Sequence, residues 1–154
     1  MPKNLVIADA SCLILLNKID ELNILKENYQ KVYITPEIAI EFNVAIPDWI
    51  EIITVKNKTL QSIFEKSLDL GESTALSLAF EIPDSTIILD DLKARKVARN
   101  LGLQITGTIG VIVNAKLRGT IPSAKYILEK ILNTDFRINA KIIDEAIRIA
   151  GESP

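Results

Sequence analysis

The sequence predicts an α/β fold, a three-layer α/β/α sandwich built around a mainly parallel central sheet. Short apolar segments alternate with longer segments of helical periodicity, which is typical of parallel strands joined by helices. The segments 5–8 (LVIA) and 86–89 (TIIL) are largely apolar on both faces, as in strands covered by helices on either side. Because the chain contains no repeat, low-complexity run or linker, we expect residues 1–154 to form a single domain.

Each predicted element has its own signals in the sequence. Strands are expected at 5–8, 32–35, 50–55, 86–89 and 103–106. Helices are expected at 12–19, 20–28, from Pro36 onward, at 58–67, from Gly71 to about 81, and at 92–101, 108–118, 122–133 and 139–150. Pro36 suits the first position of a helix, and Gly102 suits the position just after one.

Composition limits where the protein works and with what. The apolar runs are too short for a membrane span, and the N-terminus carries no leader pattern. Cys12 is the only cysteine, so no internal disulfide can form, and we expect a cytoplasmic protein. The net charge of −2 gives no general attraction to nucleic acid. Abundant isoleucine and few aromatic residues suggest a prokaryote with AT-rich codons or a warm habitat.

The chain contains no histidine. Its absence excludes catalytic triads that depend on histidine and zinc sites with imidazole ligands. If the protein is an enzyme, carboxylates, lysines, tyrosines or a metal-bound water must carry the acid–base chemistry. Oxygen ligands suit Mg²⁺ or Mn²⁺.

Three carboxylates follow predicted buried strands. Asp9 comes directly after 5–8, and Asp90 and Asp91 come directly after 86–89. Ligands bind at the carboxyl ends of the strands in open parallel sheets. We therefore expect these three acids to meet at one edge of the sheet.

Two glutamates are added to this set because of their positions on predicted helices. Glu72 lies on the same helical face as Ala75, Leu76 and Ala79, so it begins an apolar stripe. Glu41 lies in the helix that begins at Pro36. A charge on a core-facing stripe is costly unless it is paired or bound to a metal.

Each acid also has a simpler interpretation. Asp9 and one of Asp90 and Asp91 could cap the helices that follow them. Glu72 could be a first-turn residue favoured by the helix dipole, and Glu41 could be a solvated surface residue. The coincidence of all these acids at strand ends and buried helix positions favours the functional interpretation.

Taken together, these motifs resemble the PIN domain superfamily, in particular a toxin-type nuclease branch catalogued as a domain of unknown function. The resemblance is carried by Asp9-x-Ser11, by Glu41, by Leu70-Gly71-Glu72-Ser73-x-Ala75, by Leu89-Asp90-Asp91-x-Lys93-Ala94-Arg95 and by TGTIGVIVNAKLRG at 106–119. It implies a metal-dependent single-strand endoribonuclease, often the toxin of a toxin–antitoxin pair and frequently a homodimer.

The resemblance also implies a set of site residues. Asp9, Glu41, Glu72 and Asp91 would bind Mg²⁺ or Mn²⁺, with Asp90 as a fifth catalytic acid. Asp90 and Asp91 remain alternatives for the ligand after the fourth strand. Clustered carboxylates repel one another, and a divalent cation turns that repulsion into coordination.

A polyanionic substrate also requires cations near the acids. The residues expected to contact RNA are Ser11, Lys93, Arg95, Arg99, Thr108 and Lys116. The alternative for the lysines and arginines is an ordinary solvated helix face, and Thr106-Gly107-Thr108 could be an ordinary cap. The alternative for the whole chain is a PIN-like module that binds RNA or a protein without cleaving.

Overall fold

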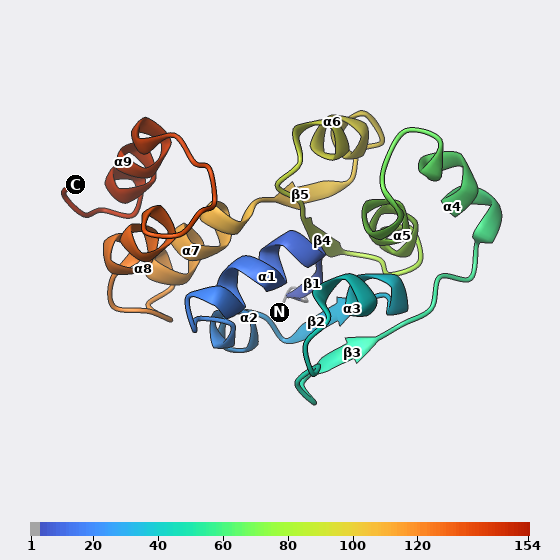
Figure 1. Ribbon diagram of the computed structural model, residues 1–154, viewed down its shortest axis with the longest axis horizontal. Coiled ribbons are helices and arrows are strands. Elements are labelled where there is room, and N and C mark those ends of the chain that lie inside the picture. The colour runs from blue at the N-terminus through green and yellow to red at the C-terminus, as the bar shows by residue number, and fades with distance from the viewer. Residues whose placement is uncertain (1–3) are drawn as a thin grey trace.

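The computed structural model describes residues 4–154 and contains a five-stranded sheet in which every described pairing is parallel (Figure 1). The strand order is β3-β2-β1-β4-β5. The strands are β1 Leu5–Ala8, β2 Lys31–Ile34, β3 Ile50–Ile52, β4 Ser85–Ile88 and β5 Gln104–Thr106. The predicted α/β/α sandwich with a parallel sheet is confirmed.

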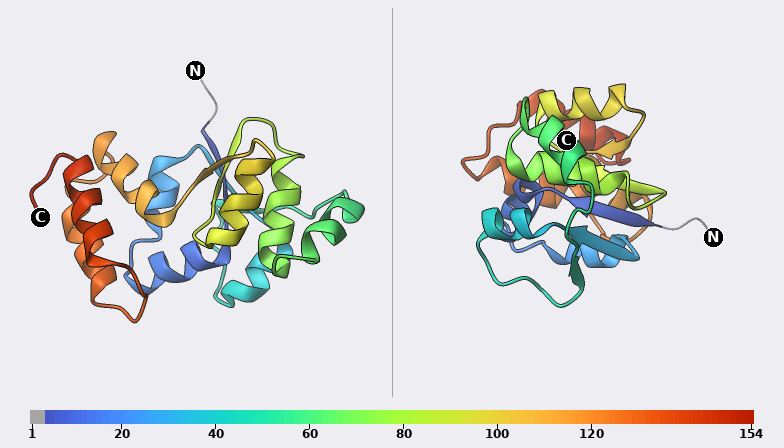
Figure 2. Two further views of the ribbon diagram at one scale, coloured as in Figure 1. Left: turned by 90° about the horizontal axis from the view of Figure 1, so that it is seen from above. Right: turned by 90° about the vertical axis from the view of Figure 1, so that its right-hand side faces the viewer.

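Helices connect the strands and cover both faces of the sheet. The right-hand view of Figure 2 shows α5 and α6 above the strands. Right-handed crossovers place helices on both faces when the chain reverses direction across the sheet. The helices described are α1 Ala10–Lys18, α2 Asn23–Asn28, α3 Pro36–Phe42, α4 Lys58–Glu65, α5 Leu70–Ala79, α6 Leu92–Asn100, α7 Thr108–Leu117, α8 Ala124–Leu132 and α9 Ala140–Ile149.

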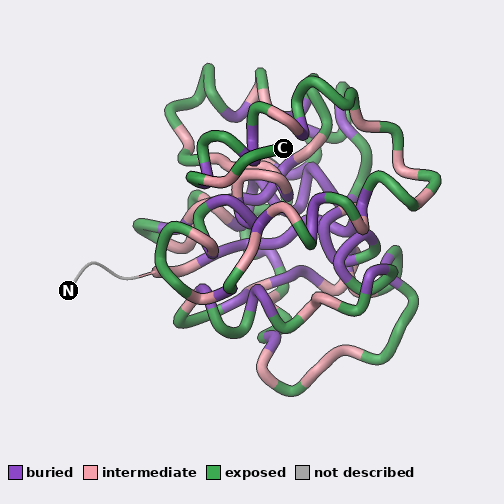
Figure 3. Tube along the Cα trace, turned by 90° about the vertical axis from the view of Figure 1, so that its left-hand side faces the viewer, coloured by how far each residue is buried: buried purple, intermediate pink, exposed green. Residues whose placement is uncertain are grey.

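The core lies along the two central strands and beneath α1. Val6, Ile7 and Ile87 are fully buried, as the apolar pattern of these strands predicts. Figure 3 shows buried segments running through the middle of the molecule, with exposed segments around them. At one end of the molecule, α7, α8 and α9 contact one another (Figure 1). No helix within residues 4–154 is long and apolar enough to cross a membrane.

The sequence predicted the order of the elements, and their bounds differ by a few residues. Two elements are shorter by three residues at one end: the predicted helix 20–28 begins at Asn23, and the predicted strand 50–55 ends at Ile52. This strand lies at the edge of the sheet and Ile52 is exposed, so little apolar burial extends the pairing. The prediction of a strand at 86–89 is shifted by one residue, because β4 ends at Ile88.

The sheet topology determines where the acids lie. Parallel strands have their carboxyl ends at one edge, and β1 pairs with both β2 and β4. Asp9 therefore leaves the sheet between the start of α3 and the turn that carries Asp90 and Asp91.

Candidate active site

Asp9 is the most deeply buried acid of the site. It follows β1 and is the N-cap of α1, where its Oδ1 accepts a hydrogen bond of 2.9 Å from the Ala10 amide. The residue is only 5% exposed. The capping interpretation is therefore correct for Asp9, but it does not explain the burial, because most N-cap residues lie at the surface.

Glu41 approaches Asp9 from α3, and Gly71 of α5 lies against both. A Cβ atom on Gly71 would be 3.0 Å from Glu41 Oε1 and 3.6 Å from Asp9 Oδ1. Glu41 is exposed, so its side chain reaches this point from the solvent side. Three separate elements thus bring two carboxylates and a glycine together.

Glu72 adds a further carboxylate from the first turn of α5. It is 9% exposed, which agrees with the prediction that it begins the apolar stripe of this helix. Glu72 and Asp69 form a capping box: the Glu72 amide donates to Asp69 Oδ1 at 2.8 Å, and the Asp69 amide donates to Glu72 Oε1 at 3.3 Å.

Asp69 belongs to this acidic site and was missed by the sequence analysis. Its charge raises the pKa of Asp9, of Glu41 and of Glu72. The spacing of Asp69 and Glu72, an N-cap acid followed three residues later by glutamate, is a capping-box signature. That signature could have identified Asp69 as the start of α5 and hence as a neighbour of Glu72.

The acids perturb one another's titration. Burial, together with the charges of Glu72, Asp69 and Glu41, raises the pKa of Asp9 to about 7. Burial and the charges of Asp69, Asp91 and Glu41 likewise raise the pKa of Glu72 to about 7, and the pKa of Glu41 is raised mainly by burial. None of the ion pairs in the described part of the chain includes one of these acids. The cluster thus carries negative charge with no basic side chain paired to it.

The two adjacent aspartates after β4 have different surroundings. Asp91 is the exposed N-cap of α6, its Oδ2 accepts from the Ala94 amide at 2.9 Å, and its charge raises the pKa of Glu72. Asp90 accepts from both the amide and the hydroxyl of Thr108, at 2.8 and 2.5 Å. Asp91 therefore faces the acid cluster, and Asp90 joins the end of β4 to the start of α7.

Arg95 and Gly107 lie beside Asp90. The Arg95 Nη1 donates to the Leu89 carbonyl at 2.7 Å. A Cβ atom on Gly107 would be 3.0 Å from both Arg95 Nη1 and Asp90 Oδ1. Arg95 is therefore half-buried against the backbone and is not on the outer face of α6.

The other residues expected to contact RNA are dispersed. Lys93 and Arg99 are exposed on α6, and Ser11 is half-buried in the first turn of α1. Lys116 lies in the last turn of α7, where its charge lowers the pKa of Glu152. It is therefore near Glu152 and not near the acids of the candidate site. Both donors of Thr108 serve Asp90, so an RNA contact by Thr108 requires that pair to open and stays a prediction.

Comparison with known families agrees with this architecture. A family model described as a PIN domain matches residues 5–152. The chain belongs to the PIN domain family. No curated protein matches the chain. PIN domains are generally nucleases that act on nucleic acid and usually use divalent metal ions.

The acids of this PIN domain fit a divalent cation in their chemistry. They supply hard oxygen donors, their raised pKa values mark charge that nothing offsets, and Gly71 leaves space between Asp9 and Glu41. Across residues 4–154, no three acidic or cysteine side chains stand close enough together to hold one ion.

Proposed function

We propose that this PIN domain is a metal-dependent endoribonuclease that hydrolyses single-stranded RNA, working as one domain over residues 1–154. The observation that carries the proposal is the approach of Asp9 and Glu41 to one another beside Gly71, with Glu72 as the next residue and with the pKa values of all three acids raised by burial and by neighbouring carboxylates. A structural role alone does not account for so many unpaired acids at the functional edge of a parallel sheet.

Asp9, Glu41, Glu72 and Asp91 would hold Mg²⁺ or Mn²⁺, and Asp69 adds negative charge behind Glu72. A bound divalent ion supplies Lewis-acid chemistry, because it lowers the pKa of water and stabilises charge on a phosphate.

The protein's own groups position the reactants. Hydrolysis adds a water oxygen to phosphorus, breaks one phosphorus–oxygen ester bond and moves a proton from the water toward the leaving oxygen. Asp9 and Glu72, whose pKa values are about 7 in the metal-free protein, would be kept ionised by the bound cation and would act as its oxygen ligands. The hydrogen bonds from Ala10 and Asp69 fix the orientation of these two carboxyl groups.

The biological setting is proposed from the resemblance alone. It supports a toxin paired with a cognate antitoxin protein, acting as a homodimer in the cytoplasm of a prokaryote.

A cleavage assay tests the proposal. We expect wild-type protein to cut mixed single-stranded RNAs in Mn²⁺ or Mg²⁺ and to be inactive in excess EDTA. Asp9→Asn should abolish cutting, because the buried side chain loses its charge and one of the oxygen ligands proposed for the metal ion. Glu129→Gln, which changes an exposed acid on α8, is the matched control and should cut like wild type. Cutting that persists in EDTA would overturn the proposal.

The second candidate is a PIN domain that binds RNA or a protein without cleaving. It is favoured by the absence, within residues 4–154, of three acidic side chains already gathered for one ion. A Mn²⁺ titration followed by thermal unfolding distinguishes the two candidates. Saturable stabilisation that Asp9→Asn removes supports the nuclease, and its absence supports the binding module.

A further inference from the structure

A pocket lies beside Asp90, between the start of α6, the first turn of α7 and the segment that leads into α9. Its volume is about 350 Å³, within the range of sites that bind small organic groups. Apolar side chains form much of its surface, among them Leu92, Ile109, Phe136 and Ile142. Asp90 and Arg137 supply charge at its border.

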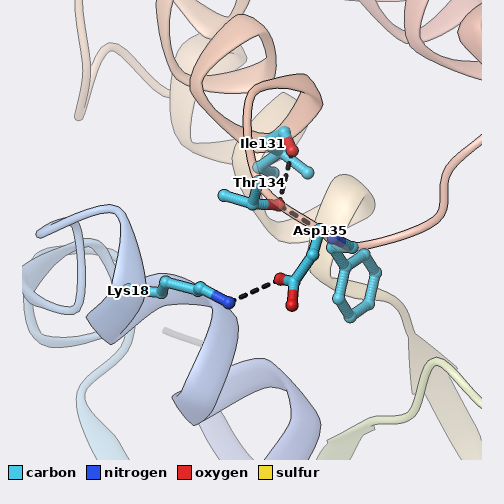
Figure 4. A network of polar contacts seen from close by, with 5 residues as sticks. Lys18, Ile131, Thr134 and Asp135 are labelled. Carbon is cyan, nitrogen blue, oxygen red and sulfur yellow. Dashed lines mark hydrogen bonds and ion pairs between the residues drawn. The ribbon is translucent and has the colours of Figure 1, made fainter.

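The wall that carries Phe136 is held in place by polar contacts (Figure 4). Lys18 at the end of α1 pairs with Asp135 at 2.5 Å. The Thr134 hydroxyl donates to the Ile131 carbonyl at 2.6 Å, and the Phe136 amide donates to Thr134 Oγ1 at 3.1 Å. These contacts join the segment to both α1 and α8.

The lining distinguishes this pocket from its neighbour. A groove of about 440 Å³ between α7 and α9 is almost entirely apolar, with Lys141 and Glu145 as its charged residues. The pocket beside Asp90 instead combines an aromatic ring and branched apolar side chains with polar groups at one border. A nucleobase has the matching chemistry, because its faces are apolar and its edge forms hydrogen bonds.

The pocket adjoins the turn that leads to the acid cluster. Asp90 lines the pocket, and the next residue in the chain, Asp91, is one of the acids proposed to hold the metal ion. A nucleotide whose phosphate lies near the acids can therefore place a base on the other side of this turn. Arg137 lines the pocket and Arg95 lines an adjoining depression that shares Asp90 and Leu92. Both cations are placed to attract the phosphates that flank the base.

We infer that this pocket is a base-binding subsite, which holds one nucleobase of a single-stranded RNA beside the phosphate at the acids. The inference rests on the proposed function, since it names how the same substrate is held. Phe136 supplies the stacking surface. The groove between α7 and α9 plays no part in it.

RNA binding in EDTA, without cleavage, tests the inference. The probes are fluorescent single-stranded RNA hexamers, each compared with versions that carry an abasic ribose at one position. We expect wild type to lose affinity at one position by about 5- to 150-fold, the range that corresponds to about 1–3 kcal/mol per stacked base. We call this loss of affinity the abasic penalty. Phe136→Ala should weaken binding of the intact hexamer and remove the abasic penalty at that position.

Two further variants keep the outcome clear. Phe80→Ala removes a half-exposed aromatic ring at the end of α5 and should retain the abasic penalty. Ile142→Asn, at an exposed position of the pocket, should reduce the penalty even if Phe136→Ala does not fold. Equal binding of intact and abasic hexamers by wild type, or an unchanged penalty in both pocket variants, would overturn the subsite.

The subsite and the nuclease fail separately. Metal-dependent cleavage without an abasic penalty leaves the nuclease standing and removes the subsite. A penalty at one position without any cleavage supports the subsite and overturns the nuclease.

Discussion

At the scale of single residues, Asp9 has two roles that usually belong to different side chains. It caps α1 through the Ala10 amide and it is buried among other acids. The amide bond lowers the pKa of Asp9, but burial raises it further, and the net result is a pKa of about 7. Asp9 is therefore a cap whose charge is costly in the absence of a cation.

Asp9 should make the stability of the metal-free protein depend on pH. Its folded-state pKa of about 7 lies above the ordinary 3.8, so the folded state holds the proton more tightly, and stability falls as pH rises from about 4 to 7. Asp9→Asn keeps the cap and removes the charge, so at pH 8 in EDTA we expect a gain of at least about 1 kcal/mol in the free energy of unfolding. Urea unfolding at pH 5 and pH 8 measures it.

The control for this prediction is Glu129→Gln, whose unfolding curves should match those of wild type at both pH values. Loss of stability in Asp9→Asn at pH 8 would mean that Asp9 acts as a cap and that its charge is not destabilising. Mn²⁺ should stabilise wild type by about 2.7 kcal/mol at a hundredfold excess over its Kd and stabilise Asp9→Asn much less.

At the scale of elements, the start of α5 combines a helix cap with the acid cluster. The Asp69–Glu72 capping box satisfies helix donors and also fixes the Glu72 carboxyl group near Asp91 and Glu41. Gly71 lies between Asp69 and Glu72 in the sequence, and because it has no side chain it leaves the space next to Glu41 and Asp9 open. The same turn thus stabilises the helix and shapes the site.

Gly71→Ala should separate these two contributions. Alanine is the better helix former by up to about 1 kcal/mol, and the neighbouring Glu41 side chain is flexible, so we expect stability within about 1 kcal/mol of wild type. The added methyl group would occupy the space between Glu41 and Asp9, so stabilisation by Mn²⁺ should shrink. Thermal unfolding with and without Mn²⁺ measures both effects.

Gly107→Ala is the matched control, because its methyl group would crowd Asp90 and Arg95 at 3.0 Å. We expect it to lower stability and keep the Mn²⁺ response, since Asp90 is held by Thr108 and is not among the four acids proposed to bind the ion. A full Mn²⁺ response in Gly71→Ala would show that the ion does not lie between Asp9 and Glu41.

At the scale of the whole molecule, the charge is distributed unevenly. The net charge is −2, and the acids occupy the carboxyl edge of the sheet. Lys93, in the first turn of α6, is an exposed cation near that edge, and Arg99 is exposed in the last turn of the same helix. RNA approaching the acids would therefore be attracted by the outer face of α6.

Reversing these two charges should weaken RNA binding. We expect Lys93→Glu combined with Arg99→Glu to lower affinity for single-stranded RNA at low salt and to reduce the salt dependence of binding, because fewer counterions are released. Fluorescence anisotropy across a salt series measures this change. Arg95 is left intact, because its guanidinium holds the Leu89 carbonyl.

The matched control reverses Lys26 and Lys31, which are exposed near the start of β2, at the opposite edge of the sheet. This variant has the same net charge and should bind RNA like wild type. Equal weakening in both variants would assign the effect to overall charge, and no weakening in the α6 variant would make that face an ordinary solvated surface.

The sequence by itself determined the α/β class, the order of the elements and the positions of Asp9, Asp90 and Asp91 near strand ends. These features depend on local periodicity and on turn residues, and both can be read from residues that are close together in the sequence. It also indicated the burial of Glu72, because helical phase is a local property. The capping box that includes Asp69 was present in the same local pattern and could have been recognised.

Only the tertiary structure decided which acids face one another. Asp90 accepts hydrogen bonds from Thr108 at the start of α7, whereas Asp91 caps α6 and its charge acts on Glu72. Arg95 lies against the backbone because its guanidinium donates to the carbonyl of Leu89, which directly follows β4. The pocket beside Asp90 joins it to Phe136, far along the chain. Such contacts are set by long-range packing, which no local pattern of residues encodes.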